Sequence, residues 1–392
     1  MKLVVVHKSF KIRGGAENLI LWSLDDLQRR FPEISITLVS ENLPSPAVCT
    51  AGREIALNEH IFSWPKTFYS LAGVFSGVDA VITHNFPSML LSSLALRIFR
   101  NNSTRLYWYC HEPPAHFFDK SADAAKKRFS NFRINPLRAD LLLKKAGVMM
   151  ERNAVKRCTG VWANSRRTAD FADEIYGIKS SVLYPGIPDY FFSQAETGKS
   201  VREETLARYG LKKNGFIISA GRLVREKKFD YLIRALSLEQ NRLPALVIVG
   251  SGPDQTRLEN CARECGTRKV IFTGFIPETD LDLLYRLSLF SVALPADEPF
   301  GLAVTEAMAR RSIILFSSDG GAAEIINNGE NGFLCNASSI RDIAQNLVKI
   351  SRLIKNSPAR ADRIRKNAFA TAENYSIKAF NDSLVKRISG RE

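Results

Sequence analysis

Residues 290–310, FSVALPADEPFGLAVTEAMAR, contain a strand, a loop and a helix in one short stretch. The apolar run Phe290–Leu294 predicts a buried strand, and Gly301–Arg310 predicts a helix. Pro299 places Glu298 in the loop, because a residue before proline disfavours the helical conformation. An apolar strand that passes directly into a helix is typical of a parallel sheet covered by helices.

The same alternation extends in both directions along the chain. Further strands are predicted at Leu3–His7, Ser35–Ser40, Ala80–Thr83, Arg105–Cys110, Ser181–Tyr184, Phe216–Ala220, Ala245–Gly250, Val270–Thr273 and Ile313–Ser317. Further helices are predicted at Glu17–Phe31, Ser88–Arg100, Leu137–Cys158, Phe229–Leu238, Pro253–Cys265, Glu278–Arg286, Gly321–Asn327, Pro358–Asn374 and Ile377–Ile388. We therefore expect an α/β protein with two doubly wound parallel-sheet domains, and ligands at the carboxyl ends of the strands, in the cleft between the domains.

The boundary between the domains is predicted at the Pro/Gly cluster Tyr184–Pro188 and the polar stretch Phe191–Lys199. Such segments interrupt both helical and strand patterns. The expected organisation is a Rossmann-like domain at 1–185, a second at 186–375, and a terminal helix within 376–392 that packs back on the first domain.

Composition excludes several classes of protein. Hydrophobic residues make up 45% of the chain and charged residues 24%, as in ordinary soluble domains. No stretch reaches the roughly 18 apolar residues that a membrane span requires. The six cysteines are scattered and form no CxxC pair, so we expect neither a disulfide scaffold nor a zinc ribbon. We expect the cysteines to be reduced thiols in the cytosol.

The net charge of +15 indicates an acidic partner. Residues 120–167 hold thirteen Lys or Arg and three acidic residues, and phenylalanines are interleaved with the cations. No nucleic-acid-binding module is recognisable, which leaves an anionic membrane surface and a solvated basic face as the alternatives. The residues assigned to that surface are Lys126, Lys127, Arg128 and Arg133.

Two glycine and cation motifs follow predicted strands. Gly14 and Gly15 precede a helix, where exposed N–H groups favour an anion, although such glycines are often purely steric. Arg222 and Lys227 follow the strand Phe216–Ala220, and their charges suit a diphosphate. GxGxxG and the P-loop are absent, which removes the main support for nicotinamide and NTPase chemistry.

Glu298 and Glu306 are separated by seven residues. On one continuous helix they would lie about 80° apart, but with Glu298 in the loop both can reach a ligand. The N–H groups of Gly301 and Leu302 would point toward a phosphate. A carboxylate that accepts sugar hydroxyls beside an anion site is difficult to explain by packing alone.

In this order, Gly14-Gly15, Arg222 with Lys227 and Glu298-x7-Glu306 resemble family 4 glycosyltransferases, which are retaining enzymes with the GT-B fold. The resemblance also includes Ala163–Ser165, Tyr184–Gly186, Val249–Pro253 and Gly320–Glu324, and so covers nearly the whole chain. Tyr107–Pro114 is similar to members that build lipid-linked or cell-surface glycans, often mannosyltransferases. Lys228 departs from the family, which usually has glycine there.

The resemblance implies a role for each matching residue. Arg222 and Lys227 would stabilise the leaving diphosphate, Glu298 would receive donor-sugar hydroxyls, and His111 would face the reacting sugar. Glu306 would hold the ribose, and the remaining donor-side positions are Gly14, Gly15, Gly250, Phe275, Ile276, Phe300, Gly301 and Leu302.

A nucleoside diphosphate leaves readily once its charge is neutralised, so cations replace the general acid of a glycosidase. We expect same-face retention, with a diphosphate oxygen taking the acceptor proton. Asp280-Leu281-Asp282 matches DxD by letter but lies at a helix start, where acids favour the helix dipole. No metal site and no cofactor are expected.

The expected function is transfer of a hexose from a nucleotide sugar to a glycan or glycolipid acceptor. The favoured donor is GDP-mannose, and the enzyme is expected in the cytoplasm, peripheral to the membrane. UDP-linked glucose, galactose or N-acetylglucosamine is the alternative donor. The alternative functions are a GT-B epimerase or phosphorylase, a non-catalytic protein that binds nucleotide sugars or glycans, and, least favoured, a nucleic-acid binder.

Overall fold

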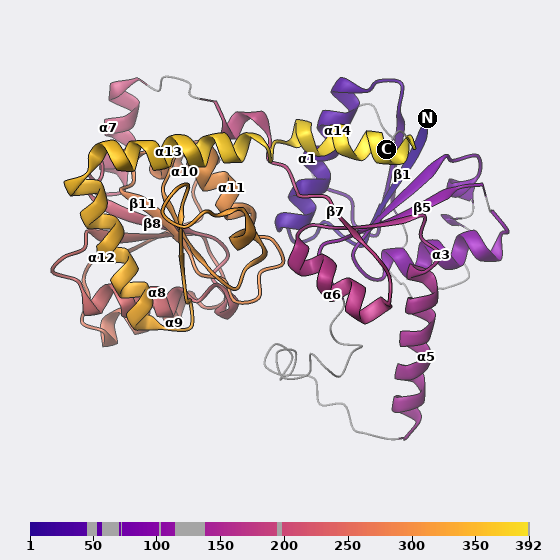
Figure 1. The fold of residues 1–392 in the computed structure, drawn as a ribbon, viewed down its shortest axis with the longest axis horizontal. Coiled ribbons are helices and arrows are strands. Elements are labelled where there is room, and N and C mark those ends of the chain that lie inside the picture. The colour runs from indigo at the N-terminus through magenta and orange to yellow at the C-terminus, as the bar shows by residue number, and fades with distance from the viewer. Residues whose placement is uncertain are drawn as a thin grey trace. The chain divides into compact units, whose positions relative to one another are not determined.

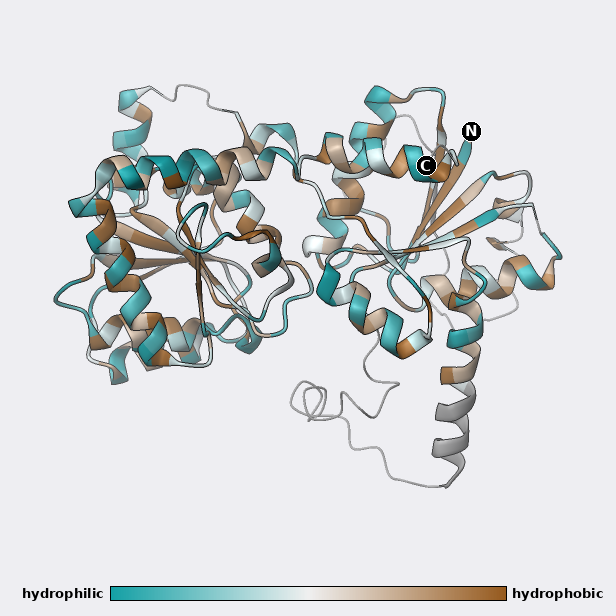
Figure 2. Cartoon of the chain, viewed as in Figure 1, coloured by the Kyte–Doolittle hydropathy of each residue, from teal (hydrophilic) through white to brown (hydrophobic). Residues whose placement is uncertain are grey.

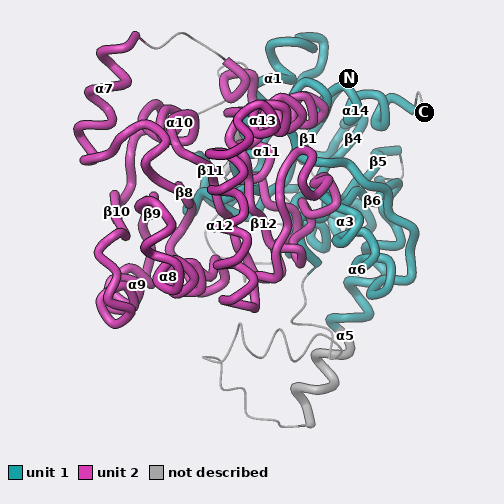
Figure 3. Tube along the Cα trace, turned by 60° about the vertical axis from the view of Figure 1, so that its left-hand side comes forward, with its two compact units in different colours: residues 1–186, 377–392 teal, residues 187–376 magenta. Residues whose placement is uncertain are grey.

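The computed structural model describes residues 1–44, 53–56, 70–71, 73–101, 103–113, 138–193 and 198–390. The chain forms two compact units (Figures 1 and 3): unit 1 comprises Met1–Gly186 and Ile377–Glu392, and unit 2 comprises Ile187–Ser376. The chain therefore passes from unit 1 into unit 2 and returns.

Unit 1 is built on a seven-stranded parallel sheet. Its strands are β1 (Lys2–His7), β2 (Ser35–Ser40), β3 (Arg53–Ala56), β4 (Ala80–His84), β5 (Arg105–Cys110), β6 (Gly160–Ala163) and β7 (Ser181–Val182), in the order β3-β2-β1-β4-β5-β6-β7. The helices are α1 (Gly15–Arg30), α3 (Ser88–Ile98), α5 (Arg138–Val155), α6 (Arg166–Tyr176) and α14 (Ile377–Ile388).

Strand alternation divides the apolar side chains of unit 1 between two cores. Leu3 and Val5 of β1 pack in one core with α1 and α14. Val4 and Val6 point to the opposite face and pack in a core that includes α3. Because both faces are covered, β1 is apolar along its length rather than alternating (Figure 2).

Unit 2 is built on a six-stranded parallel sheet. Its strands are β8 (Phe216–Ala220), β9 (Ala245–Val249), β10 (Val270–Gly274), β11 (Phe290–Ala293), β12 (Ile314–Ser317) and β13 (Phe333–Cys335), in the order β10-β9-β8-β11-β12-β13. The α-helices are α7 (Lys199–Arg208), α8 (Phe229–Leu238), α9 (Gln255–Glu264), α10 (Glu278–Leu287), α11 (Leu302–Ala309), α12 (Ile340–Asn356) and α13 (Pro358–Glu373). Three 3₁₀-helices are η3 (Asp189–Phe191), η4 (Arg225–Lys227) and η5 (Gly321–Ile325).

Both sheets reverse their strand order at one point, between β1 and β4 in unit 1 and between β8 and β11 in unit 2. Adjacent connections at such a switch point leave the sheet in opposite directions, which opens a crevice at the carboxyl ends of the strands. The loops that follow these four strands are therefore the places to look for a site.

The prediction of two doubly wound parallel sheets is confirmed. The segment Gly321–Asn327 was predicted as an α-helix, which is wrong: Gly321–Ile325 is a 3₁₀-helix. Lys199, expected to end the polar linker, begins α7. The sequence patterns did not predict β3, β6, β13, α6, α7 or α12. Among the described residues, we find no helix that is both long and apolar enough to cross a membrane.

Candidate functional site

The loop after β8 carries Arg222 and Lys227 at the switch point of unit 2. It lies close against the loop after β9: the N–H of Leu223 donates to the Ser251 carbonyl at 3.0 Å. A Cβ at Gly250 would lie 2.1 Å from the Gly221 carbonyl oxygen, so this approach requires glycine. Gly250 thereby fixes the backbone beside Arg222, whose side chain is exposed.

Lys228 occupies the position where the resembling family usually has glycine, and its φ of 49° lies in the left-handed region. Only a minority of residues other than glycine adopt this conformation. The Lys228 ammonium donates to the Ser338 hydroxyl at 3.1 Å. The loop therefore has the backbone turn that glycine would provide, despite the larger residue.

The loop after β11 places Glu298 against the cationic loop. The Lys227 ammonium lies 2.6 Å from a Glu298 carboxylate oxygen, and both side chains are partly exposed. The N–H of Ala296 donates to the Glu226 carbonyl at 2.7 Å, which ties the two loops together. The structure thus brings Lys227 and Glu298, 71 residues apart, into direct contact at the edge of the sheet.

Gly301 is the N-cap of α11, and its φ of 104° lies in a region that residues with side chains rarely adopt. A Cβ there would lie 3.0 Å from the Phe316 ring. The Phe300 carbonyl accepts from Ala322 at 2.7 Å, and the Glu298 carbonyl accepts from Gly321 at 2.9 Å. These bonds to η5 hold the Glu298 loop in place, with Phe300 buried and Leu302 partly exposed.

Glu306 lies one helical turn further along α11. Burial raises its pKa, and the guanidinium of Arg310 opposes that rise. Arg310 is buried, and its Nη1 is 3.8 Å from a Glu306 oxygen. Sequence reasoning missed Arg310, because nothing in the local pattern shows that this arginine turns inward.

Phe275 and Ile276 follow β10 and have opposite environments. Phe275 is 86% exposed, whereas Ile276 is buried. An aromatic ring that is left open to solvent at the carboxyl edge of a sheet offers a face for stacking. The assignment of this backbone to a nucleobase remains a prediction.

In unit 1, the helix start at Gly14 is capped by the chain itself. The N–H of Gly14 donates to Glu17 at 2.8 Å, and the other Glu17 oxygen lies 3.1 Å from Nε2 of His7. Burial raises the pKa of Glu17, but the hydrogen bond with His7, the backbone N–H donors of Glu17 and Gly14, and the charge of His7 together outweigh this effect, so the net pKa lies below its usual value. An anion at Gly14 and Gly15 would therefore meet an ionised carboxylate, and the remaining N–H groups of this turn would have to bind it.

His111 lies in a buried pair with His84. Nε2 of His111 is 3.0 Å from Nδ1 of His84, and the His111 carbonyl accepts from the Asn164 amide at 2.9 Å. Burial lowers the pKa of His111 to about 3 and that of His84 well below its usual value. Both rings are therefore neutral at physiological pH, and the N–H of one ring donates a hydrogen bond to the bare nitrogen of the other.

His7 and His84, which sequence reasoning did not select, end β1 and β4 on the two sides of the switch point of unit 1. Nδ1 of His7 is buried without a hydrogen-bond partner in the described structure. The signal that could have identified both is their position: each is a histidine at the carboxyl end of a strand beside a strand-order reversal.

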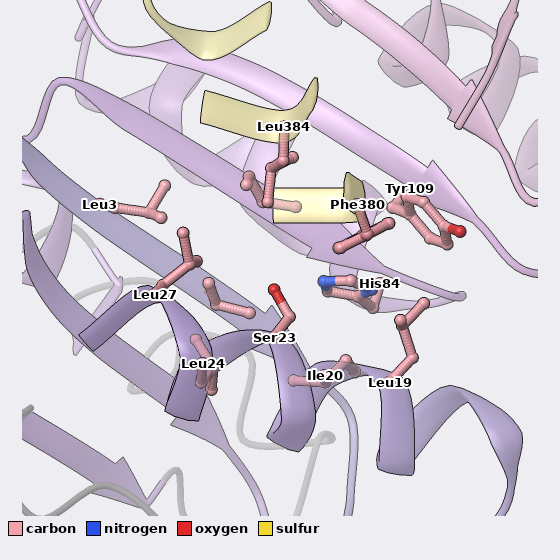
Figure 4. Close-up of a pocket in the computed structure, with 12 residues that line it drawn as sticks. Leu3, Leu19, Ile20, Ser23, Leu24, Leu27, His84, Tyr109, Phe380 and Leu384 are labelled. Atoms are coloured by element: carbon pink, nitrogen blue, oxygen red, sulfur yellow. The ribbon is translucent and has the colours of Figure 1, made fainter. Parts of the chain in front are cut away.

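A cavity of about 20 Å³ lies behind His84 (Figure 4). It is lined by residues of α1, by Phe380 and Leu384 of α14, and by Tyr109. This volume accommodates about one water molecule, so the cavity does not hold a substrate.

Asp280 and Asp282 are both engaged by arginines. Asp280 pairs with Arg208 at 2.7 Å, and Asp282 pairs with Arg286 at 2.7 Å and Arg310 at 3.1 Å. No group of three potential metal ligands is found in the described ranges. The basic residues Lys126, Lys127, Arg128 and Arg133 lie outside those ranges.

The chain superimposes over its full length on HepE from Anabaena in complex with UDP, with a TM-score of 0.77 and 18% identity across 100% of both chains. The chain of residues 1–392 therefore has the GT-B fold. Within it, residues 201–371 match the family "Glycosyl transferases group 1", so this match lies inside unit 2 of the GT-B chain.

Two curated relatives resemble parts of the GT-B chain. An uncharacterized glycosyltransferase of Methanocaldococcus jannaschii is 41% identical over 118 residues, 30% of each chain. A GDP-mannose-dependent alpha-(1-6)-phosphatidylinositol monomannoside mannosyltransferase of Mycolicibacterium smegmatis is 30% identical over 40% of this chain and 43% of that one. The matched region thus spans less than half the length of either relative.

Proposed function

We propose that this protein is a retaining, metal-independent hexosyltransferase that moves a hexose from a nucleotide sugar to a glycan or glycolipid acceptor. The observation that carries the proposal is the contact between Lys227 and Glu298, which joins two adjoining loops at the β8/β11 switch point and lies on the same loop as the exposed Arg222. The match to group 1 glycosyl transferases covers the same segment.

In this proposal, a nucleotide-sugar donor separates the Lys227–Glu298 ion pair when it binds. Its diphosphate competes with Glu298 for the Lys227 ammonium, and its sugar hydroxyls donate to the carboxylate that is released. Arg222, exposed on the same loop, adds a planar donor for phosphate oxygens. Neutralised in this way, the diphosphate leaves without a general acid.

The proposal includes retention of the anomeric configuration. The acceptor arrives on the face from which the diphosphate leaves, and a phosphate oxygen takes its proton. His111 does not serve as the acid, because its low pKa leaves it neutral. A neutral ring also adds no positive charge beside an oxocarbenium-like centre.

GDP-mannose is the first donor that we propose, supported by the mycolicibacterial relative, whose name specifies GDP-mannose. A UDP-linked hexose is the second, since HepE has been solved with UDP-glucose. The proposed acceptor is a lipid-linked or cell-surface glycan at the cytoplasmic face of an anionic membrane.

The proposal is tested by incubating the purified chain with GDP- and UDP-sugars in EDTA and measuring released nucleoside diphosphate. We expect release from one donor class, lost in Glu298→Ala and reduced by about 10²-fold or more in Arg222→Ala, as for other losses of charge stabilisation. Glu226→Ala and Arg225→Ala, on the same loop pair, are matched controls that retain activity.

Each other outcome has a distinct meaning. An Arg222→Ala rate within a few fold of the unaltered chain contradicts the leaving-group role. Release that stops in EDTA and returns with Mg²⁺ contradicts metal independence. Calorimetric binding of a nucleotide sugar without release, even with candidate acceptors, favours the non-catalytic alternative.

A further inference from the structure

Arg310 is the largest charged side chain buried in unit 2. It follows the last residue of α11 and is 1% exposed. Its guanidinium lies 4.3 Å from the Phe191 ring centroid and 4.9 Å from that of Tyr285. Two aromatic faces therefore fix the plane of the guanidinium, with Phe191 supplied by η3, just after the chain enters unit 2.

The edges of the guanidinium face three carboxylates. Nη2 binds Glu278, and Nε lies 3.1 Å from Asp282. These two bonds join α11 to α10 and are sufficient for a purely structural role. Arg286 shares two of these partners: it binds Asp282 within α10 at 2.7 Å and donates to the Phe191 carbonyl of η3 at 3.4 Å.

Nη1 of Arg310 differs from the other two nitrogens. It is buried without a hydrogen-bond partner among the described residues, and a carboxylate oxygen of Glu306 lies 3.8 Å away. That separation is too long for a hydrogen bond but short enough for electrostatic attraction between the two charges. A buried donor left without a partner is rare and costs about 1–3 kcal/mol in other proteins, so this one requires an explanation.

We propose that Arg310 is a positioning residue for Glu306, holding its carboxylate ionised and oriented to receive the two hydroxyls of the donor ribose. The inference rests on the proposed function and on the ribose-binding role that the family resemblance implies for Glu306. Charge supports it, because burial of Glu306 favours the neutral form and Arg310 is the principal group that counters this effect. A neutral carboxyl would offer the diol one proton and a weaker acceptor.

The test compares binding of nucleotides with and without ribose hydroxyls. UDP and GDP are titrated calorimetrically into the protein, each beside its 2′,3′-dideoxy analogue, and the affinity ratio within each pair is the readout. We expect the unaltered chain to prefer the intact ribose by about tenfold or more, as hydrogen bonds to a charged acceptor do. In Arg310→Met the ratio falls to the value in Glu306→Gln, and combining both changes lowers it no further.

Arg286→Met is the matched control, because it removes a cation from Asp282 and from Phe191 without touching Glu306. Its ratio stays at the unaltered value. Arg310→Gln, which removes the charge but keeps a polar side chain, provides a second variant if Arg310→Met does not fold, and its ratio also falls.

Three results would overturn the inference. An unchanged ratio in folded Arg310→Met or Arg310→Gln removes Arg310 from ribose recognition while leaving the proposed transferase intact. An equal fall of the affinity ratio in Arg286→Met would show that the effect comes from a general loss of packing around α10 and α11. An unaltered chain that binds UDP or GDP without preferring the ribose removes the role of Glu306, whereas failure to bind either nucleotide contradicts the proposed function itself.

Discussion

At the scale of single residues, burial holds several ionisable groups of unit 1 in their neutral forms. His111 and His84 have lowered pKa values because burial disfavours the imidazolium. Glu151 is fully buried on α5, where the Tyr176 hydroxyl donates to it at 2.7 Å, and burial raises its pKa to about 7. The neutral histidines suit a transfer that needs no general acid, whereas the buried glutamate affects folding.

From the raised pKa of Glu151 we predict that its contribution to the free energy of unfolding decreases as pH rises. The folded state binds the proton more tightly than the unfolded chain, so its contribution is complete below about pH 4.5 and is lost as pH rises through about 7. Glu151→Gln removes this dependence and preserves an acceptor for Tyr176. We expect the variant to gain up to about 3 kcal/mol over the unaltered chain between pH 5 and 8.

Urea unfolding at several pH values measures this difference. Glu174→Gln, an exposed carboxylate on α6, is the control and should follow the unaltered chain at every pH. A constant difference between Glu151→Gln and the unaltered chain across the range would contradict the assignment.

At the scale of elements, α14 is held on α1 by a buried polar cluster. Asn381 is fully buried: the Ser23 hydroxyl donates to its side-chain oxygen at 2.6 Å, and its amide nitrogen donates to Asp26 at 2.9 Å. Near the surface, Arg30 of α1 pairs with the half-exposed Asp382. The cluster explains why α14, although it follows unit 2 in the sequence, packs in unit 1 (Figure 3).

These two contacts between α1 and α14 predict unequal effects. Asn381→Leu keeps the approximate volume but leaves Ser23 and Asp26 without this partner, and should destabilise by about 1–3 kcal/mol. Asp382→Asn, on the neighbouring exposed position, should change the free energy of unfolding by less than about 1 kcal/mol. Chemical denaturation of both variants checks the ranking, and equal effects would show that burial is not the cause.

At the scale of the whole molecule, the net charge of +15 points to an anionic partner. We expect sedimentation with vesicles that contain anionic lipid and little with neutral vesicles. Binding should weaken steeply with salt, because exposed charges are screened within about 10 Å at 0.1 M ionic strength. Charge reversal of Lys126, Lys127 and Arg128 should abolish it.

Reversal of Lys349, Arg352 and Lys355 on α12 is the matched control for the same change in net charge. An equal loss there would show that total charge, rather than one segment, drives binding. Undiminished sedimentation after reversal at 126–128 would remove the basic segment from the proposed surface.

The sequence alone determined the two parallel sheets and the loops after β8 and β11, because strand periodicity and glycine or proline punctuation are local signals. It selected Arg222, Lys227, Glu298 and Glu306 by spacing and resemblance. It did not predict the short edge strands β3 and β13, which carry too few residues for a clear pattern. It also could not show that Lys228 takes the left-handed turn without glycine, since the surrounding chain imposes that conformation.

Only the tertiary structure decided which distant side chains form hydrogen bonds, ion pairs or buried contacts with one another. His84 meets His111 across 27 residues, and Phe191 covers Arg310 from more than a hundred residues away. Such contacts depend on which strands are neighbours and which helix faces turn inward, and a local pattern contains neither. The physical reason is that propensity acts over a few residues, whereas burial and electrostatics act between whatever the fold brings together.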